Sequence, residues 1–392
     1  MATGLFESVP NFSEGRRGDV IDAIAAAAGM AYVLDTDPDP DHNRVVVSLA
    51  GSRARVVDGL LAAIGVATEQ IDLRAHSGVH PRVGAADVVP IVPLGGTTLD
   101  ECRQVSAEDL EAAGFASADN PISDELHEGT SLVVGASLVA AESIQSGAAL
   151  HAFSPSGGLH HAHRARASGF CTYNDAAVAC RWLKDRGHRV AYVDVDVHHG
   201  DGVEGIFQSD PDVLTISLHE SGRWLFPGTG FPDDAGVGPG RGSVANLPFV
   251  PYTWDEPWLS AFEKIVPAML RRFKPTVLVT QDGCDTHYLD PLAHLAATTR
   301  IWPRVGRLFH ELAHELCDGR WLALGGGGYA IREVVPRAWT LLFAEMVERP
   351  DLATDLDDPS EVVPSAEAQE RVWSALRRDL SRLGEVHGMD FG

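Results

Sequence analysis

The sequence predicts an α/β protein with a parallel sheet, preceded by a small α+β segment. From about Ala107, short apolar strands alternate with helical patterns, an order typical of a parallel sheet covered by helices on both faces. The first 105 residues instead follow the order strand, helix, two strands, helix and strand. We therefore expect two domains, over residues 1–105 and 106–392, the second ending in a tail from about residue 349.

The elements of the first domain can be placed from local patterns. The stretch "YVLDTDPDPDHNRVVVSLAG" predicts two strands around a turn rich in Pro and Asp. Helical patterns cover about residues 18–28 and 53–69, and "ADVVPIVPL" predicts a further strand. The resulting βαββαβ order predicts a ferredoxin-like α+β segment.

The second domain is expected to alternate strands with helices. Ser123 would cap a long helix, and a shorter helix would begin at its cap Asn174 and end at Gly187. The expected strands are "ALHAFSP", "RVAYVDVDV", "VLTISLH", "TVLVTQ" and "RWLALGG", and further helices are expected near Phe262, Leu308 and Trp339 and over residues 365–383.

Composition narrows the classes of protein and partner. The formal net charge of −24 predicts no nucleic-acid partner and no binding to anionic membranes. The five cysteines are scattered without a CxxC pair, which favours reduced thiols over a disulfide framework. No segment has the pattern of a signal peptide or the apolar length of a membrane span. We expect a soluble cytoplasmic protein.

The stretch "YVDVDVHHGDG" (192–202) places acidic and histidine side chains at the end of a strand. Because side chains alternate along a strand, Asp194, Asp196 and His198 share one face. A carboxylate with an imidazole suits zinc or another first-row metal, and the second strand end "TQDGCD" offers Asp282 and Asp285 as a further ligand. The alternative is a hydrogen-bonded strand end without a metal.

The stretch "SGGLHHAHRARASGFCTYND" (156–175) follows another strand. His160 and His161 come after two glycines, which let the backbone turn and approach a substrate. Two imidazoles near a metal-bound water are suitable general acids and bases, and buried carboxylates such as Asp194 and Asp201 could orient them. The alternative is a solvated histidine-rich loop.

The stretch "LALGGGGYAIREV" places Tyr329 in a glycine-rich turn between a strand and a helix. Such turns often bind phosphate, but no Lys follows and the pattern is not that of a P-loop. A tyrosine hydroxyl at this turn can instead donate to an oxyanion. "LFPGTG" could place Phe226 in a pocket wall, and its alternative is an ordinary turn.

These motifs carry a resemblance to a known family. Residues of about 107–348 resemble the zinc-dependent histone deacetylase family, and within it the bacterial acetoin-utilisation deacetylases. The resemblance rests on "DNP", "GGLHHAHRARASGFCTYND", "YVDVDVHHGDG", "LTISLHE", "FPGTG", "TQDGCDTHYLDPL" and "LGGGGY". It implies the arginase/deacetylase-like parallel-sheet fold.

The resemblance also implies roles for individual residues. Zinc would be bound by Asp196, His198 and Asp285. The residues acting with a metal-activated water would be His160, His161 (the acid/base), Asp194 and Asp201 (which orient the two histidines), and Tyr329 (which polarises the acetyl carbonyl). The acyl-lysine channel would be lined by Gly169, Phe170, Phe226 and Leu292, with Asp119 on its rim. The family also binds potassium, here near Asp194, Asp196, His198, Ser217 and Leu218.

Residues of about 1–102 resemble the start of glutamate formiminotransferase. The resemblance rests on "VPNFSEG", "DPDPDHNRVVVS" and "HSGVHPRVGAADVVPIVPL", and His80 matches that family's catalytic histidine. The second subdomain of that family is absent, so we predict no formiminotransferase activity. This segment stands where deacetylases carry their first strand and an active-site loop.

The leading hypothesis is a zinc-dependent hydrolase that removes acetyl groups from acetyl-lysine side chains of proteins through a metal-activated water. The alternatives are an acetylpolyamine deacetylase, a formiminotransferase-type folate enzyme and an inactive fusion. The expected partner is an acetylated protein or a small acetylated amine, with no nucleic acid and no membrane.

Overall fold

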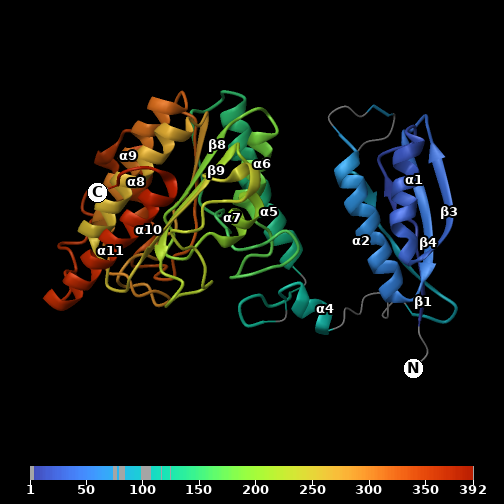
Figure 1. Cartoon of the computed structure of the whole chain (residues 1–392), viewed down its shortest axis with the longest axis horizontal. Coiled ribbons are helices and arrows are strands. Elements are labelled where there is room, and N and C mark those ends of the chain that lie inside the picture. The colour runs from blue at the N-terminus through green and yellow to red at the C-terminus, as the bar shows by residue number, and fades with distance from the viewer. Residues whose placement is uncertain are drawn as a thin grey trace. The chain divides into compact units, whose positions relative to one another are not determined.

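The computed structural model describes residues 4–73, 77–78, 84–98, 107–115, 117–123 and 125–391. The chain forms two compact units, Met1–Ser106 and Ala107–Gly392 (Figure 1). Each unit has a sheet of its own, antiparallel in the first and parallel in the second.

The described part of the first unit has two helices on one antiparallel sheet, which confirms the predicted small α+β segment, although two short strands stand at each end where one was expected. Strand β4 pairs with β3 on one side and with β1 and β2 on the other, while β6 and β5 pair with β1 and β2. Apolar side chains of both helices and the sheet form its core, including Phe12, Ile24, Leu49 and Leu60. The elements are β1 (Leu5–Ser8), β2 (Asn11–Phe12), α1 (Gly18–Ala27), β3 (Tyr32–Asp39), β4 (Arg44–Gly51), α2 (Arg53–Gln70), β5 (Ala86–Val88) and β6 (Ile91–Leu94).

The second unit is built on a six-stranded sheet in the order β10-β9-β8-β11-β12-β7, with every neighbouring pair parallel. This confirms the predicted α/β class. The strands are β7 (His151–Ser154), β8 (Val190–Asp194), β9 (Val213–Glu220), β10 (Val244–Phe249), β11 (Val277–Gln281) and β12 (Trp321–Leu324).

Helices cover both faces of this sheet (Figure 1). One face packs on α8, α9 and α10 through a large apolar cluster that includes Trp258, Phe309 and Leu342, and the other packs on α5 and α6 through a cluster that includes Ile144 and Leu183. The helices are α4 (Ala107–Ala112), α5 (Leu126–Gln145), α6 (Asp175–Lys184), α7 (Asp201–Phe207), α8 (Asp255–Phe273), α9 (Trp302–Leu316), α10 (Val335–Met346) and α11 (Ala366–His387). Among the helices of the described residues, none combines the length and the apolar character needed to cross a bilayer.

Several local features differ from the sequence expectations. The long helix α5 begins at Leu126 with Glu125 at its N-cap, not Ser123, and the short helices α4 and α7 were not predicted. Strand β10 was not predicted, and its Pro248 explains why, since proline is confined to edge strands and β10 lies at one edge of the sheet. Strand β8 ends at Asp194, before the expected end at Val197. The chain turns after Asp194 while Val195 and Val197 stay buried in the core, so the carboxylates still point to the other side.

The parallel arrangement positions the site. Strands β8, β9 and β11 are neighbours, and their register aligns Asp194 with Ser217 on one side and with Gln281 on the other. The loops that follow these strands therefore leave the sheet at the same side, beyond the C-terminal ends of the strands, which is where parallel α/β sheets bind their ligands.

Candidate metal and catalytic site

Three buried side chains converge where β8 and β11 end. Nδ1 of His198 lies 3.1 Å from Oδ1 of Asp196 and 3.0 Å from Oδ2 of Asp285. All three residues are buried, and one ligand atom from each lies within 4.8 Å of the others. One nitrogen and two carboxylate oxygens at these separations match a zinc-type ligand set with an open coordination position.

The outer oxygens of both carboxylates are held by donors from the protein. Oδ2 of Asp196 accepts from the backbone N–H of Gly327 and from Nε2 of Gln281, each at 2.7 Å. Oδ1 of Asp285 accepts from the backbone N–H of Val197 at 2.9 Å. The oxygens that face His198 are thereby oriented toward a common point, which is what the surroundings of a metal ligand must achieve.

The electrostatics of the cluster favour a bound cation. Burial and the neighbouring charge of Asp196 raise the pKa of Asp285 to about 7. Although burial opposes it, hydrogen bonds with Asp196 and Asp285 raise the pKa of His198 to about 11. Two buried carboxylates this close need positive charge between them, and a divalent cation would supply it.

The histidine pair lies beside this cluster. Nδ1–H of His160 donates to Oδ2 of Asp194 at 2.7 Å, and Nδ1–H of His161 donates to Oδ1 of Asp201 at 2.7 Å. The tautomers follow from the partners, because a carboxylate only accepts. Nε2 of His160 lies 3.9 Å from Oδ1 of Asp196, so the pair reaches the cluster.

The pKa values of the two imidazoles are shifted in opposite directions. Burial opposes the charging of His160, but Asp194 and Asp196 raise the pKa of His160 to about 9. Burial and the charge of His160 lower the pKa of His161 to about 3. The pair therefore holds one ring that is protonated on both nitrogens, His160, and one neutral ring, His161, whose Nε2 can accept a proton.

Two glycines allow the backbone to approach the carboxylates. A Cβ atom on Gly327 would lie 2.0 Å from Oδ2 of Asp285, and one on Gly283 would lie 2.0 Å from Oδ2 of Asp196. A larger residue at position 327 would displace the oxygen of Asp285 that faces His198, and one at position 283 would displace the outer oxygen of Asp196. The glycine-rich turn after β12 thus closes around the cluster, which the phosphate-binding alternative does not explain.

Tyr329 follows this turn and faces the cluster. Burial and the charges of Asp196 and Asp285 raise the pKa of Tyr329, so its hydroxyl remains protonated and can donate. Its backbone N–H donates to Oδ2 of Asp290 at 2.8 Å. The other oxygen of Asp290 accepts from the backbone N–H of Leu292 at 3.0 Å, which joins two of the residues singled out in the sequence.

The aromatic residues expected to line a channel lie around the same point. The ring of Phe226 contacts His161 with centroids 5.0 Å apart, and the ring of Phe170 contacts Tyr329 with centroids 5.9 Å apart. Gly169 lies between, since a Cβ there would fall 2.4 Å from His161 and 2.9 Å from Phe226. The side chains of Phe170, Phe226 and Leu292 are all substantially exposed.

The remaining sequence candidates lie in different places. Ser217 and Leu218 are buried on β9, where Ser217 is aligned with Asp194, and their role in binding potassium stays a prediction. Asp119 is exposed in a bend, and its role on the rim stays a prediction. His80 lies outside the described residues. Asp282 is directed away from the cluster, with Oδ2 accepting from Thr280.

Sequence reasoning missed three residues that organise the site. Gln281 donates to Asp196, and Asp290 holds Tyr329. Asp175 is fully buried and accepts the backbone N–H groups of Gly158 and Leu159, which fixes the loop that carries the histidine pair. Asp175 directly follows the N-cap Asn174, and this acidic residue at the helix start was the available signal.

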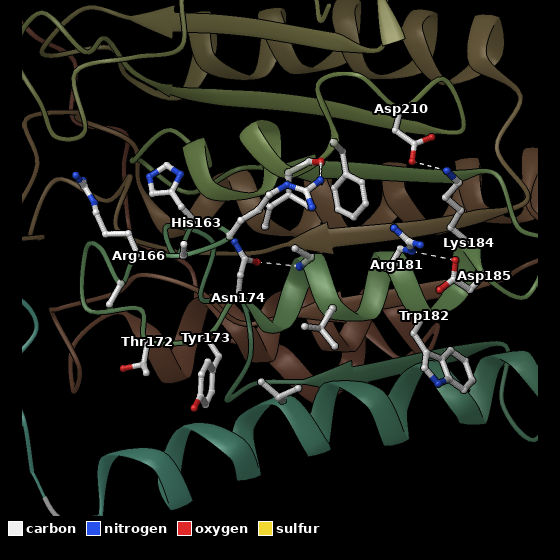
Figure 2. Close-up of a pocket in the computed structure, with 18 of the residues that line it drawn as sticks. His163, Arg166, Thr172, Tyr173, Asn174, Arg181, Trp182, Lys184, Asp185 and Asp210 are labelled. Carbon is white, nitrogen blue, oxygen red and sulfur yellow. Dashed lines mark hydrogen bonds and ion pairs between the residues drawn. The ribbon is translucent and has the colours of Figure 1, made fainter. Parts of the chain in front are cut away.

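A cavity of about 1190 Å³ adjoins the site on the side of α5 and α6 (Figure 2). His163 lines it and lies 3.3 Å from Oδ2 of Asp201, the carboxylate that also holds His161. Two of its basic side chains pair with acidic neighbours, Lys184 with Asp210 and Arg181 with Asp185, while Arg164 and Arg186 donate to backbone carbonyl oxygens. We assign the chemistry to the buried cluster, because it brings the metal-ligating side chains and the histidine pair together.

Comparison with known proteins identifies the family. The histone deacetylase domain matches residues 96–346, and the N-terminal subdomain of the formiminotransferase domain matches residues 5–116, which confirms both resemblances. The chain is 46% identical over 273 residues to the acetoin utilization protein AcuC of Bacillus subtilis (strain 168), covering 68% of this chain and 70% of that protein. It is 38% identical over 247 residues to AcuC of Staphylococcus aureus (strain MSSA476), covering 63% and 64%, and 32% identical over 301 residues to AcuC of Staphylococcus xylosus, covering 75% and 76%. With the deacetylase domain matching more than half of its length, this chain belongs to the histone deacetylase family.

Proposed function

We propose that this chain is a zinc-dependent amidohydrolase that removes acetyl groups from acetyl-lysine side chains of proteins. The observation that carries the proposal is the convergence of Asp196, His198 and Asp285 beside two histidines, each hydrogen-bonded to its own carboxylate. Membership of the deacetylase family supports the reaction type.

The residues of the site divide the chemistry between them. A divalent metal bound by the three ligands would supply Lewis acidity toward water and toward the amide carbonyl. His161 would take the proton from the attacking water through Nε2, because its Nδ1–H is committed to Asp201. The histidine pair would then return a proton to the nitrogen of the leaving lysine. The hydroxyl of Tyr329 would donate to the oxyanion of the tetrahedral intermediate.

We also propose that potassium binds beside the pair of strands β8 and β9, near Asp194, Asp196, His198, Ser217 and Leu218. Support comes from the register, which aligns Asp194 with Ser217, and from the burial of all five residues. A cation there would balance the negative charge of the Asp194 carboxylate, which also accepts the Nδ1–H of His160. Turnover in potassium should exceed turnover in an equal concentration of a bulky organic cation, and equal rates would contradict the proposal.

The test is turnover of an acetyl-lysine peptide by the full-length chain. Zinc-loaded protein should release acetate and be inhibited by a hydroxamate. Removal of metal with a chelator should abolish turnover, and added zinc should restore it. Folded, zinc-bound protein without turnover would contradict the proposal and would support the inactive-fusion alternative.

The same protein distinguishes the substrate classes. An N-acetylated polyamine is the second candidate, because the net charge of −24 favours cationic substrates. A larger kcat/KM for the polyamine than for the peptide would select it. We propose no formiminotransferase activity, since only the N-terminal subdomain of that domain is matched; turnover of formiminoglutamate with folate would overturn this.

A further inference from the structure

A second group of metal-ligating side chains lies away from the proposed catalytic site. It consists of His151, His310 and His314, which bring one ring nitrogen each within 4.8 Å of the others. His151 is the first residue of β7, whereas the catalytic cluster follows the last residues of β8 and β11. All these strands are parallel, so His151 lies at the N-terminal end of the strands and the catalytic cluster lies at their C-terminal end.

We propose that these three histidines bind a divalent first-row transition metal, with zinc as the reference ion. Imidazole suits zinc, copper and nickel, while magnesium and calcium require oxygen ligands. His151 and His310 are half-buried and His314 is exposed, so the group is both shaped by the fold and accessible to a metal from solvent.

The separation of the ring nitrogens matches a shared metal. Nε2 of His314 lies 3.3 Å from Nε2 of His151. Two nitrogens bound tetrahedrally at zinc–nitrogen distances near 2.05 Å would lie about 3.3 Å apart. The rings of His310 and His314 have centroids 4.6 Å apart, and those of His151 and His310 lie 4.9 Å apart, so the third ligand is also in reach.

The surroundings of His310 fix the tautomer that metal binding requires. Its Nδ1–H donates to the backbone carbonyl oxygen of Met346 at 3.3 Å, which leaves the lone pair on Nε2. Oε1 of Glu348 lies 3.8 Å from this Nε2. The carboxylate of Glu348 could therefore provide the fourth ligand, and water is the alternative.

The helix geometry explains how the group is assembled. His310 and His314 lie four residues apart on α9, so they share one face of the helix. His151 comes from β7, Met346 is the last residue of α10, and Glu348 lies two residues after it. A metal here would tie the edge strand β7 to α9 and α10. Because it would bind only the folded chain, it would stabilise the second unit.

The test compares metal content and thermal stability in four full-length proteins. Wild type should bind two zinc ions per chain, whereas His314→Asn should bind one and keep its deacetylase activity. His198→Ala should lose the other ion, so failure of the proposed function and failure of this inference are separately visible. His42→Asn, which alters an exposed histidine of the first unit, should match wild type. Equal zinc content in His314→Asn and wild type would overturn the inference.

A second measurement uses wild-type protein alone. Zinc should protect His314 from modification by diethyl pyrocarbonate, as read by mass spectrometry of the peptide that contains it. Cobalt in place of zinc should give the visible absorption of a four-coordinate nitrogen site in His198→Ala. Unprotected His314 at saturating zinc would overturn the inference even if the His314→Asn variant did not fold.

Discussion

Nε2 of His160 lies 3.0 Å from Nε2 of His161, while the opposite nitrogen of each ring is held by a different carboxylate. The two rings face each other with only one proton between them. This relationship predicts that the histidines are not interchangeable, because His161 is the ring kept neutral.

The first prediction concerns His161. His161→Asn should lower kcat for an acetyl-lysine peptide by about 100-fold or more, the usual contribution of a general base, without loss of zinc. His163→Asn is the matched control, since the side chain of His163 reaches Asp201 at Oδ2, the oxygen that does not bond His161, and is partly exposed. Steady-state kinetics and metal analysis of both variants check the prediction. A kcat for His161→Asn close to that of the control would contradict it.

The second prediction concerns Tyr329. Tyr329→Phe removes the hydroxyl but retains the backbone N–H that Asp290 accepts, so the turn should keep its structure. Turnover should fall by about 100-fold or more, as for loss of an oxyanion donor, with zinc content unchanged. Tyr288→Phe, at an exposed tyrosine, should retain activity. Unchanged turnover in Tyr329→Phe would remove the oxyanion role from this residue.

The third prediction concerns the glycine turn. Gly327→Ala should weaken zinc binding and activity together, because the new Cβ would fall 2.0 Å from the ligand oxygen of Asp285. Gly135→Ala, in the interior of α5, has open space around the new Cβ and should raise helix stability by about 1 kcal/mol. Zinc titration and thermal unfolding of both variants distinguish these effects. A Gly327→Ala protein with wild-type zinc affinity would mean that the turn can move.

The fourth prediction concerns pH and Asp358. This buried carboxylate accepts from His287, from the backbone N–H of Thr299 and from Arg337, and these bonds outweigh burial and lower the pKa of Asp358 to about 2. A depressed pKa gives stability that is complete above the unfolded-state pKa near 4 and is lost as pH falls toward 2. The contribution is about 2 kcal/mol.

Urea unfolding of wild type and Asp358→Asn checks this at several pH values. The difference in unfolding free energy should be large at pH 6 and smaller at pH 3. Asp318→Asn, at an exposed carboxylate, should show a small difference at both. A difference for Asp358→Asn that does not change with pH would show that the carboxylate charge is not what stabilises the fold.

Most strands of the second unit and the convergence of Asp196 and His198 could be predicted because their signals are local. Asp196 and His198 follow one strand within four residues, and alternation along the chain already puts them on one side. Strand β10 could not be predicted, because Pro248 argues against a strand unless the edge position is known. The domain boundary was predicted from the change in the order of helix and strand patterns between residues 1–105 and 106–392.

The supporting residues could not be predicted for a different reason. Gln281 and Asp290 both lie in the quoted stretch "TQDGCDTHYLDPL", but they act through contacts with Asp196 and Tyr329, which are far from them in sequence, and the stretch alone does not indicate these contacts. The group of His151, His310 and His314 could not be predicted for the same reason. Its members come from segments more than 150 residues apart, so only the fold brings them together.

The order of strands in the second unit has a consequence for synthesis on the ribosome. β7 emerges first among the strands of its sheet, yet the one strand it pairs with among the described residues is β12, which follows residues 155–320. At ordinary translation rates this leaves β7 without its neighbour for roughly 10–30 s. An unpaired strand edge can pair with other chains and so promote aggregation. The short, partly polar sequence of β7, "HAFS", limits such aggregation before β12 has been synthesised.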